Sequence, residues 1–454
     1  MNRRSFLVAV LVVTVVGLGW LALRKKKAGL PDAAHRVAPS TVPAPVPAAT
    51  NSPQVSANFF TKRGKRAAGI VRPEPTRIEL PAELKTPGDF LALVPLGAVT
   101  HRAVASGPWS DPATWGGQVP GEAARVQIPE NIHVTIGDTE TSHLKSLRVD
   151  GELTIAPQQN AHLLVDTLVI NTTGSLVVGG PNNPLPPSAD ALVSLQAYHS
   201  PNDDEVARRQ SALMISMGQV LLAGQEKAAH AVFGTTPQVG DRELLLVTPP
   251  TNWKSGDLIA LGGNRQSREE TETLQVKYVT GNKVGLEPVV ANPEWKGLTG
   301  DYTTRPDQRG FAVNLTRNVA LAAPPPEVPT DSPRGSVVFH GSGVAGANLR
   351  NVGVYGLGVD DAILRGQSEA LNRPALTLQA GPANSPAKFS GVALVDAPEP
   401  GIVLDQGRAT IANSVAFDAN GGALLTPSGA PLRLIWTGER AVPGVLLKGQ
   451  PVTP

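Results

Sequence analysis

Residues 147–178 read LRVDGELTIAPQQNAHLLVDTLVINTTGSLVV. Leu147 and Leu168 begin similar apolar runs 21 residues apart, and Leu153 and Leu176 begin a second pair 23 residues apart. Strand-turn-strand units of this length, without a helical half, indicate successive coils of a β-solenoid. We therefore predict an all-β fold, a right-handed parallel β-helix, preceded by a single N-terminal transmembrane helix.

Similar steps recur further along the chain. Residues 391–394 (GVAL) return as residues 414–417 (SVAF), with Val392 and Val415 separated by 23 positions. Residues 317–321 (RNVAL) return as residues 350–354 (RNVGV), which predicts an inward aliphatic stack with asparagine at the corner. A β-sandwich with irregular loops is the main alternative.

Composition narrows the class of protein. The chain has 46 glycines, 42 prolines and only 17% charged residues, which favours short strands and turns over long surface helices. A formal net charge of +2 provides no field that would collect nucleic acid. The absence of cysteine excludes disulfides and thiolate metal sites.

The N-terminus is predicted to be a membrane anchor. Residues 5–23 carry no charge and, at about 1.5 Å per residue, are long enough to cross a bilayer once. Arg3 and Arg4 precede this run and four basic residues follow it, with no small-residue cleavage site. The basic residues after the run favour a cytoplasmic C-terminal domain, whereas the Arg-Arg-Ser-Phe-Leu start is typical of export. We expect a single pass through an inner membrane, with the C-terminal domain periplasmic or otherwise extracytoplasmic.

The sequence predicts five consecutive segments. They are a signal anchor with basic flanks (1–27), a Pro/Ala-rich disordered linker (28–58), a basic lead-in (59–99), a β domain (100–325) and continued parallel coils (326–454).

One stretch of the sequence is more informative about the kind of protein than the overall composition is. Residues 107–117 read GPWSDPATWGG, and residues 253–257 (WKSGD) and 309–313 (RGFAV) follow in order. This pattern resembles the eight-glycine, or G-eight, domain family, including its hyaluronan-binding and hyaluronidase-type β-helix members. The likeness covers about residues 100 to 430. It implies a parallel β-helix with a polysaccharide-related role outside the cytoplasm.

Two roles are considered for the two tryptophans of the opening motif. Trp109 and Trp115 could present flat indole faces to a sugar ring. Tight turns beside both residues favour instead a role in capping the exposed end of the coil.

The resemblance also indicates that this chain lacks the catalytic histidines of the hyaluronan-degrading members. The hyaluronan-degrading members carry two histidines on one strand, and the matching positions here are Leu376 and Leu378. A later family histidine corresponds to Asp405, and another corresponds to Gly422. Leucine neither binds metal nor transfers protons. The catalytic positions are therefore degenerate, and the enzyme assignment stays open with a preference for no enzymatic activity.

Two adjacent acidic residues support the alternative hypothesis that the protein is a glycoside hydrolase. Asp360 and Asp361 resemble the paired aspartates of pectin-type glycoside hydrolases, which also use β-helices. Together with Asp405 they would be the catalytic residues of a hydrolase or lyase acting on a polyuronide or hyaluronan-like polysaccharide. An aspartate pair in a turn is, however, common for conformational reasons alone.

These observations lead to one leading hypothesis. We expect a noncatalytic, membrane-anchored cell-envelope protein that binds polysaccharide or an envelope protein, with no nucleic-acid partner. We expect no cofactor and no metal, because the eight histidines are scattered without close spacing. The sequence does not specify the glycan or the oligomeric state.

Overall fold

The computed structural model describes residues 84–198, 211–261, 272–290, 310–323, 334–360, 372–397, 401–405, 408–417, 424–425 and 445–447. All of them belong to the compact unit Asn51–Pro454. The predicted anchor (5–23) and linker (28–58) lie outside the described residues. Within the described part, no helix has both the length and the apolar character that a bilayer crossing requires.

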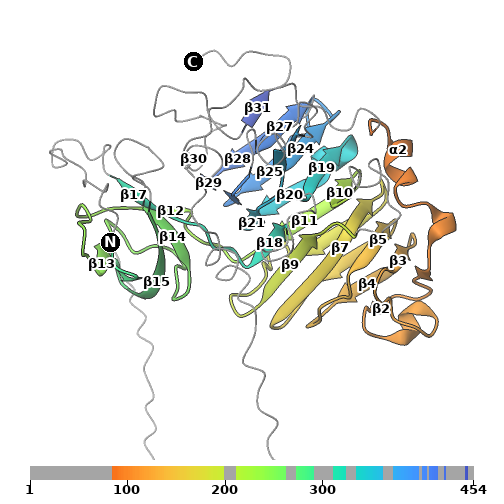
Figure 1. Cartoon of the computed structure of the whole chain (residues 1–454), viewed down its shortest axis with the longest axis horizontal. Helices are drawn as coiled ribbons and strands as arrows, with labels where there is room; N and C mark the ends of the chain where they lie inside the picture. Colours follow the sequence, from red (N-terminus) through yellow and green to blue (C-terminus); the bar gives the residue numbers. More distant parts are fainter. Residues whose placement is uncertain are drawn as a thin grey trace, which may run out of the picture. The chain divides into compact units, whose positions relative to one another are not determined.

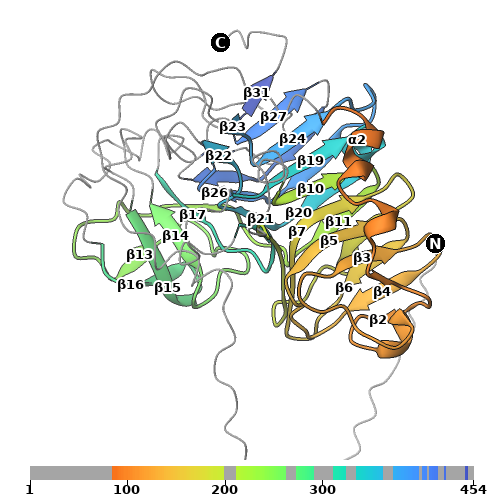
Figure 2. The ribbon, with the colours of Figure 1, turned by 45° about the vertical axis from the view of Figure 1, so that its right-hand side comes forward.

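Most strands of the described chain lie in parallel β-sheet, as Figures 1 and 2 show. The strands fall into three ladders that the chain visits in turn, and we call one passage through the ladders a rung. The eleven-residue strand β7 (Asn160–Ile170) belongs to two ladders, because its halves pair with different neighbours. These ladders confirm the all-β, parallel prediction and exclude an antiparallel sandwich for the strands that form them.

Ladder 1 contains the second half of β7. Its other strands are β1 (His101–Arg102), β3 (Arg125–Ile128), β5 (Leu144–Val149), β10 (Leu213–Ser216), β19 (Ser336–His340), β24 (Leu376–Gln379), β27 (Ile402–Asp405) and β31 (Val445–Leu447).

Ladder 2 lies next along the chain in each rung. It consists of β2 (Gly107–Pro108), β4 (His133–Ile136), β6 (Glu152–Ile155), β8 (Ser175–Val178), β11 (Gln219–Ala223), β20 (Ala347–Arg350), β25 (Ala387–Ser390) and β28 (Ala409–Ala412).

Ladder 3 completes each rung and contains the first half of β7. It continues with β9 (Asp190–Leu195), β18 (Val319–Ala322), β21 (Val352–Tyr355), β26 (Ala393–Val395) and β29 (Val415–Phe417), and β30 (Leu424–Leu425) pairs antiparallel at its end.

The repeats seen in the sequence set the register. Leu147 pairs with Leu168, and Leu153 pairs with Leu176, so the steps of 21 and 23 residues are confirmed. Alternate side chains from the three ladders point into one shared hydrophobic core, as strand geometry requires. Each apolar residue therefore stacks on a residue of similar kind in the next rung.

One predicted step was wrong by a residue. The structure pairs Ala393, and not Val392, with Val415. Val392 faces the shared core, whereas Val415 faces outward from ladder 3, so the sequence similarity had matched opposite faces.

A six-stranded antiparallel sheet interrupts the rung between β11 and β18, and the sequence did not predict it. It has its own core around Trp253, Ile259 and Leu274. Its strands are β12 (His230–Val232), β13 (Glu243–Leu245), β14 (Leu258–Leu261), β15 (Glu272–Thr280), β16 (Lys283–Glu287) and β17 (Phe311–Asn314). We call it the inserted sheet.

The outer sides of two ladders are covered. On ladder 3, Ala320 and Ala393 belong to one buried cluster with Ala260 and Val313 of the inserted sheet. On ladder 1, Val169, Leu213, Ile215 and Val338 pack against Phe90 of helix α2 (Pro87–Ala92) and its flanks. Thr86 and Asp89 form a capping box that starts this short helix.

Glycine is required where the chain turns between ladders 1 and 2. A Cβ atom on Gly174 would overlap the carbonyl oxygen of Val149 in the preceding rung, and one on Gly151 would overlap the carbonyl oxygens of Pro129 and Ile132. No other side chain allows successive rungs to approach this closely at the corner.

We expect Gly174→Ala to destabilise the protein by at least about 2 kcal/mol, because the overlap is with backbone that has little room to move. The matched control is Gly137→Ala, since a Cβ at Gly137 has no heavy atom within 4 Å. Urea unfolding of both variants measures the difference. Equal stabilities would contradict the close approach of rungs at this corner.

Candidate functional site

The outer side of ladder 2 is open from β4 to β28, whereas ladder 1 and the part of ladder 3 from β18 to β29 are covered by apolar contacts. From β4 to β28 the buried and exposed positions alternate, and nearly every outward side chain is at least partly exposed. We call this surface the open ladder face. Its residues are His133, Thr135, Glu152, Thr154, Ser175, Val177, Gln219, Leu221, Asn348, Arg350, Lys388, Ser390 and Thr410.

At one end of the open ladder face, polar groups form a connected cluster. The Nε2 atom of His133 lies 2.9 Å from Thr154 Oγ1 and 3.3 Å from Glu152 Oε1. Thr135 Oγ1 lies 3.3 Å from the same nitrogen, and Thr154 donates a hydrogen bond to Glu152. The side chains of His133 and Glu152 are about half exposed, so a ligand can reach both.

The other end of this face carries basic groups. Arg350 on β20 and Lys388 on β25 are exposed on adjacent strands. Arg350 donates a hydrogen bond through Nη1 to the carbonyl oxygen of Pro181, at 2.9 Å. The face therefore offers hydrogen-bond donors and acceptors along its whole length, with its fixed positive charge at one end.

The structure places both candidate tryptophans in the core. Trp109 and Trp115 are 3% and 6% exposed, and they meet edge to face with ring centroids 4.8 Å apart. Trp115 Nε1 donates a hydrogen bond of 2.7 Å to the carbonyl oxygen of Trp109. Their burial beside the first rung leaves no ring face open to a sugar and favours the capping role.

The carboxylate candidates are not brought together by the described residues. Asp360 lies in β22 (Val359–Asp360), which pairs with β23 (Asn372–Arg373) just before β24 begins. Asp405 ends β27, at the opposite end of the ladder 1 strands. Asp361 lies outside the described residues.

Leu376 and Leu378 both point into the shared core. They are fully buried and pair with Val337 and Phe339 of the preceding rung. A side chain at either position would face inward, so these sites are unsuited to a histidine that must reach substrate. Gly422 lies outside the described residues. In the described part of the chain, no three His, Asp or Glu side chains are placed to hold a metal ion.

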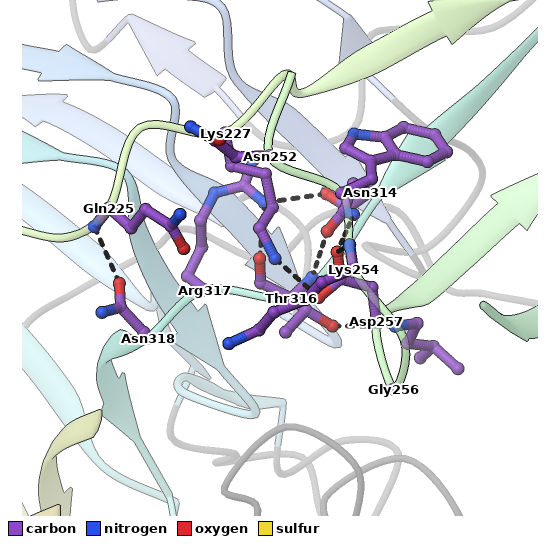
Figure 3. A network of polar contacts seen from close by, with 12 residues as sticks. Gln225, Lys227, Asn252, Lys254, Gly256, Asp257, Asn314, Thr316, Arg317 and Asn318 are labelled. Atoms are coloured by element: carbon purple, nitrogen blue, oxygen red, sulfur yellow. Dashed lines mark hydrogen bonds and ion pairs between the residues drawn. The ribbon is translucent and has the colours of Figure 1, made fainter. Parts of the chain in front are cut away.

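A buried polar network joins the inserted sheet to the chain around ladder 3 (Figure 3). Lys227 Nζ donates to Asp257 Oδ1 at 2.6 Å, and both side chains are nearly inaccessible. Asp257 Oδ2 accepts hydrogen bonds from Asn314 Nδ2 at 2.8 Å and from the backbone amide of Lys254 at 3.0 Å. The negative charge of Asp257 is thereby fully compensated.

Arg317 extends the network toward ladder 3 and the rungs beyond it. It is 1% exposed and donates to the carbonyl oxygens of Gly391, Asn314 and Thr316. Its backbone amide donates to the hydroxyl of Tyr355, which in turn donates to the carbonyl oxygen of Leu315. The guanidinium thus ties residues 314–316 to the turn at Gly391.

Burial dominates the pKa values in this network. Burial lowers the pKa of Lys227, and the neighbouring charge of Asp257 opposes that shift. Burial likewise lowers the pKa of Arg317 and raises the pKa of Tyr355. Asp190 has a pKa raised by burial, which Lys254 and Lys227 partly offset.

The motif residues of the sequence therefore have structural roles. Trp253 fills the core of the inserted sheet, and its Nε1 donates to the carbonyl oxygen of Ala228 at 2.8 Å. Gly256 adopts a positive φ of 89°, which turns the chain so that Asp257 reaches Lys227. Asn318 ties the end of β11 to the loop before β9, through Gln225 and Ala189.

Sequence reasoning missed the open ladder face because its residues are ordinary polar ones. The available clue was the rung period. Applied to His133, a step of about 20 residues reaches Glu152 and Thr154, which the structure places in contact.

Comparison with known proteins places this site in a family context. The family model described as the G8 domain matches residues 114–233. Fibrocystin-L of Homo sapiens is 26% identical over 226 residues, covering 47% of this chain and 5% of the relative. Fibrocystin-L of Mus musculus is 25% identical over 220 residues, with the same coverages. The chain thus spans about one twentieth of the length of these relatives.

Two phage tailspikes are among the similar solved structures. The tailspike gp61 of Pseudomonas phage phi297 matches at 11% identity with a TM-score of 0.18, covering 62% of this chain and 36% of the tailspike. The tailspike gp49 of Pseudomonas phage LKA1 matches at 11% identity with a TM-score of 0.19, covering 73% and 45%. These likenesses are too slight to carry an argument.

We expect Lys227→Met to destabilise the protein by roughly 3–5 kcal/mol, because it leaves the buried Asp257 carboxylate without its cation. Lys277→Met is the matched control, since Lys277 and Glu287 are mostly exposed and 3.9 Å apart; it should change stability by less than about 0.5 kcal/mol. Thermal and urea unfolding measure both. A small effect of Lys227→Met would show that the network does not hold the inserted sheet.

Proposed function

We propose, from the G8 domain that residues 114–233 form, that this chain is a cell-envelope protein that binds polysaccharide and does not cleave its glycosidic bonds. The observation that carries the proposal is the open ladder face, the one outer ladder side that no described element covers. Apolar contacts cover ladder 1 and the part of ladder 3 from β18 to β29, whereas ladder 2 keeps a largely polar outer surface.

An extended polymer suits this face better than a small molecule. Strands in a sheet lie about 4.8 Å apart, so the seven strands from β4 to β28 span about 30 Å. Thr135, Thr154, Asn348, Lys388 and Thr410 stand at one height on successive strands, and Val177 and Leu221 occupy the two positions between Thr154 and Asn348. Repeated weak contacts along a chain molecule add up, even where a single contact is worth little.

The absence of cleavage chemistry is supported by the geometry of the inherited positions. Leu376 and Leu378 face the core, and the backbone places Asp360 in β22 and Asp405 at the end of a different strand, β27. General acid-base hydrolysis of a glycosidic bond needs two carboxyl groups that flank one substrate position. We therefore favour binding over hydrolysis, with an envelope protein as the alternative ligand.

We also propose that the three ladders close into a right-handed parallel β-helix. The rungs pair in register and share one core, and parallel strands joined by crossover connections are right-handed in nearly all known cases. Such a helix would present the open ladder face as one continuous side.

We propose a cellular location from the sequence. Residues 5–23 are proposed to hold the protein in an inner membrane, with residues 28–58 as a spacer and the ladders outside the cytoplasm. Helix α2 then fixes the incoming chain to ladder 1 through Phe90.

We expect the triple variant Thr135→Ala, Glu152→Ala, Thr154→Ala to weaken polysaccharide binding at least about tenfold, because each lost hydrogen-bonding group contributes about 1 kcal/mol. The full chain in detergent is applied to an array of neutral and acidic polysaccharides, and bound protein is quantified.

Lys277→Met, on the outer part of the inserted sheet, is the control and should bind as wild type. Crosslinking to solubilised envelope proteins tests the alternative ligand in parallel. If wild type binds no polysaccharide on the array, or if the triple variant binds equally well, the proposal is wrong.

We expect a reporter that is active only in the periplasm to be active when fused after Lys27, because residues 5–23 would direct the fused reporter across the membrane. Replacing Arg3 and Arg4 by lysine tests whether the twin-arginine pattern is used and should reduce reporter activity. Activity of a cytoplasmic reporter at the same position would reverse the proposed topology.

A further inference from the structure

Three side chains meet on ladder 3 in an order that is typical of acyl-transfer enzymes. They come from neighbouring rungs: Glu140 forms an isolated bridge with His162, His162 lies in β7, and Ser194 lies in β9. His162 Nε2 is 2.8 Å from Ser194 Oγ, and His162 Nδ1 is 2.9 Å from Glu140 Oε1. The hydroxyl, imidazole and carboxylate are thus linked in series.

The carboxylate determines which ring nitrogen carries the proton. An ionised Glu140 only accepts hydrogen bonds, so the proton of neutral His162 lies on Nδ1. The lone pair of Nε2 then faces the hydroxyl of Ser194, which is the orientation of a general base. Burial lowers the pKa of His162 while Glu140 opposes that shift, which favours the neutral base.

The surroundings of Ser194 restrict the size of an acyl group. Leu164 pairs with Ser194 on one side and Ala322 pairs with it on the other, so the hydroxyl lies between apolar side chains. Ser194 is 3% exposed, whereas the side chains of His162 and Glu140 are 27% and 69% exposed. A substrate would therefore approach from the histidine side, with a small acyl group innermost.

We propose that Ser194 is a nucleophile that accepts a small acyl group from an ester, with His162 as its base and Glu140 as the residue that positions His162. Ser194 Oγ forms a bond to the ester carbonyl carbon while His162 Nε2 takes the hydroxyl proton. The carbon–oxygen bond to the alcohol then breaks, and His162 returns the proton to the departing alkoxide. Water releases the acid by the same steps, so no oxidant or cofactor is required.

The ladder limits the rate of this reaction. Ser194 lies within a strand that is paired on both sides, so nearby backbone amides are engaged in the sheet. Loss of one oxyanion-stabilising donor typically costs a factor of about 10² to 10³ in rate. We expect slow acylation that is seen most clearly as a covalent adduct and less clearly as turnover.

This inference does not depend on the proposed polysaccharide binding, because it concerns a different ladder. The open ladder face lies on ladder 2, and residues of that face take no part in the serine, histidine and glutamate arrangement. Either proposal can fail while the other stands.

The test uses the purified full chain in detergent, a fluorophosphonate probe and p-nitrophenyl acetate. Peptide mass spectrometry should locate the phosphonate adduct on Ser194, and Ser194→Ala should remove it. His162→Gln should slow labelling at least about a hundredfold. Glu140→Gln should slow it at least about tenfold, because an amide can donate to Nδ1 and favour the wrong tautomer.

Ser146→Ala is the matched control. Ser146 is similarly buried, at 7% exposed, on strand β5, and it should keep wild-type labelling. The melting temperature of each variant separates a chemical role from a structural one, since Glu140→Gln should slow labelling with little change in stability. Wild-type protein without an adduct on Ser194, or equal labelling in His162→Gln, would overturn the proposal.

Discussion

The structure depends on the in-register stacking of inward aliphatic side chains from rung to rung. Leu147 on Leu168 and Leu153 on Leu176 show the pattern, and the same alternation continues through all three ladders. Side chains alternate between the two faces of a strand. When one residue points into the core, its two neighbours in the sequence therefore point outward. The covered sides, the open ladder face and the serine-centred arrangement are all consequences of this single constraint. A slip of one residue would exchange core and surface.

The two polar clusters differ in their exposure to water, and this difference determines what each can do. The Lys227 and Asp257 pair is shielded from water, so its value lies in mutual compensation and in fixing the inserted sheet. The His133 and Glu152 cluster is half exposed, so its groups stay available for a partner molecule. Asp257 of the WKSGD stretch (residues 253–257) therefore has a structural role in this chain.

Sequence reasoning predicted the ladders well. Aliphatic runs such as those at Leu147 and Leu168 mark the strands, and the spacing between the runs gives the length of a rung. It missed the inserted sheet, since residues 230–314 share alternation with the ladders and nothing local distinguishes antiparallel from parallel pairing. It also mismatched Val392 with Val415, because it aligned residues 391–394 with residues 414–417. The left-handed residues Gly391 and Asn413 occupy matching positions in the two rungs, so that Ala393 is the partner of Val415. The contact of Glu140, His162 and Ser194 depends on loop lengths between rungs, which spacing alone does not determine.

The apolar outer side of ladder 3 has an evolutionary consequence. Ala320, Ala393 and Val415 have small or aliphatic side chains that lie beneath the inserted sheet and its linkers. A descendant that lost this sheet by deletion would expose a continuous water-repelling strip and tend to self-associate. Such a deletion would be tolerated only with simultaneous polar replacements along the strip. Ladder 3 and the inserted sheet are therefore expected to be inherited together, as one indivisible unit.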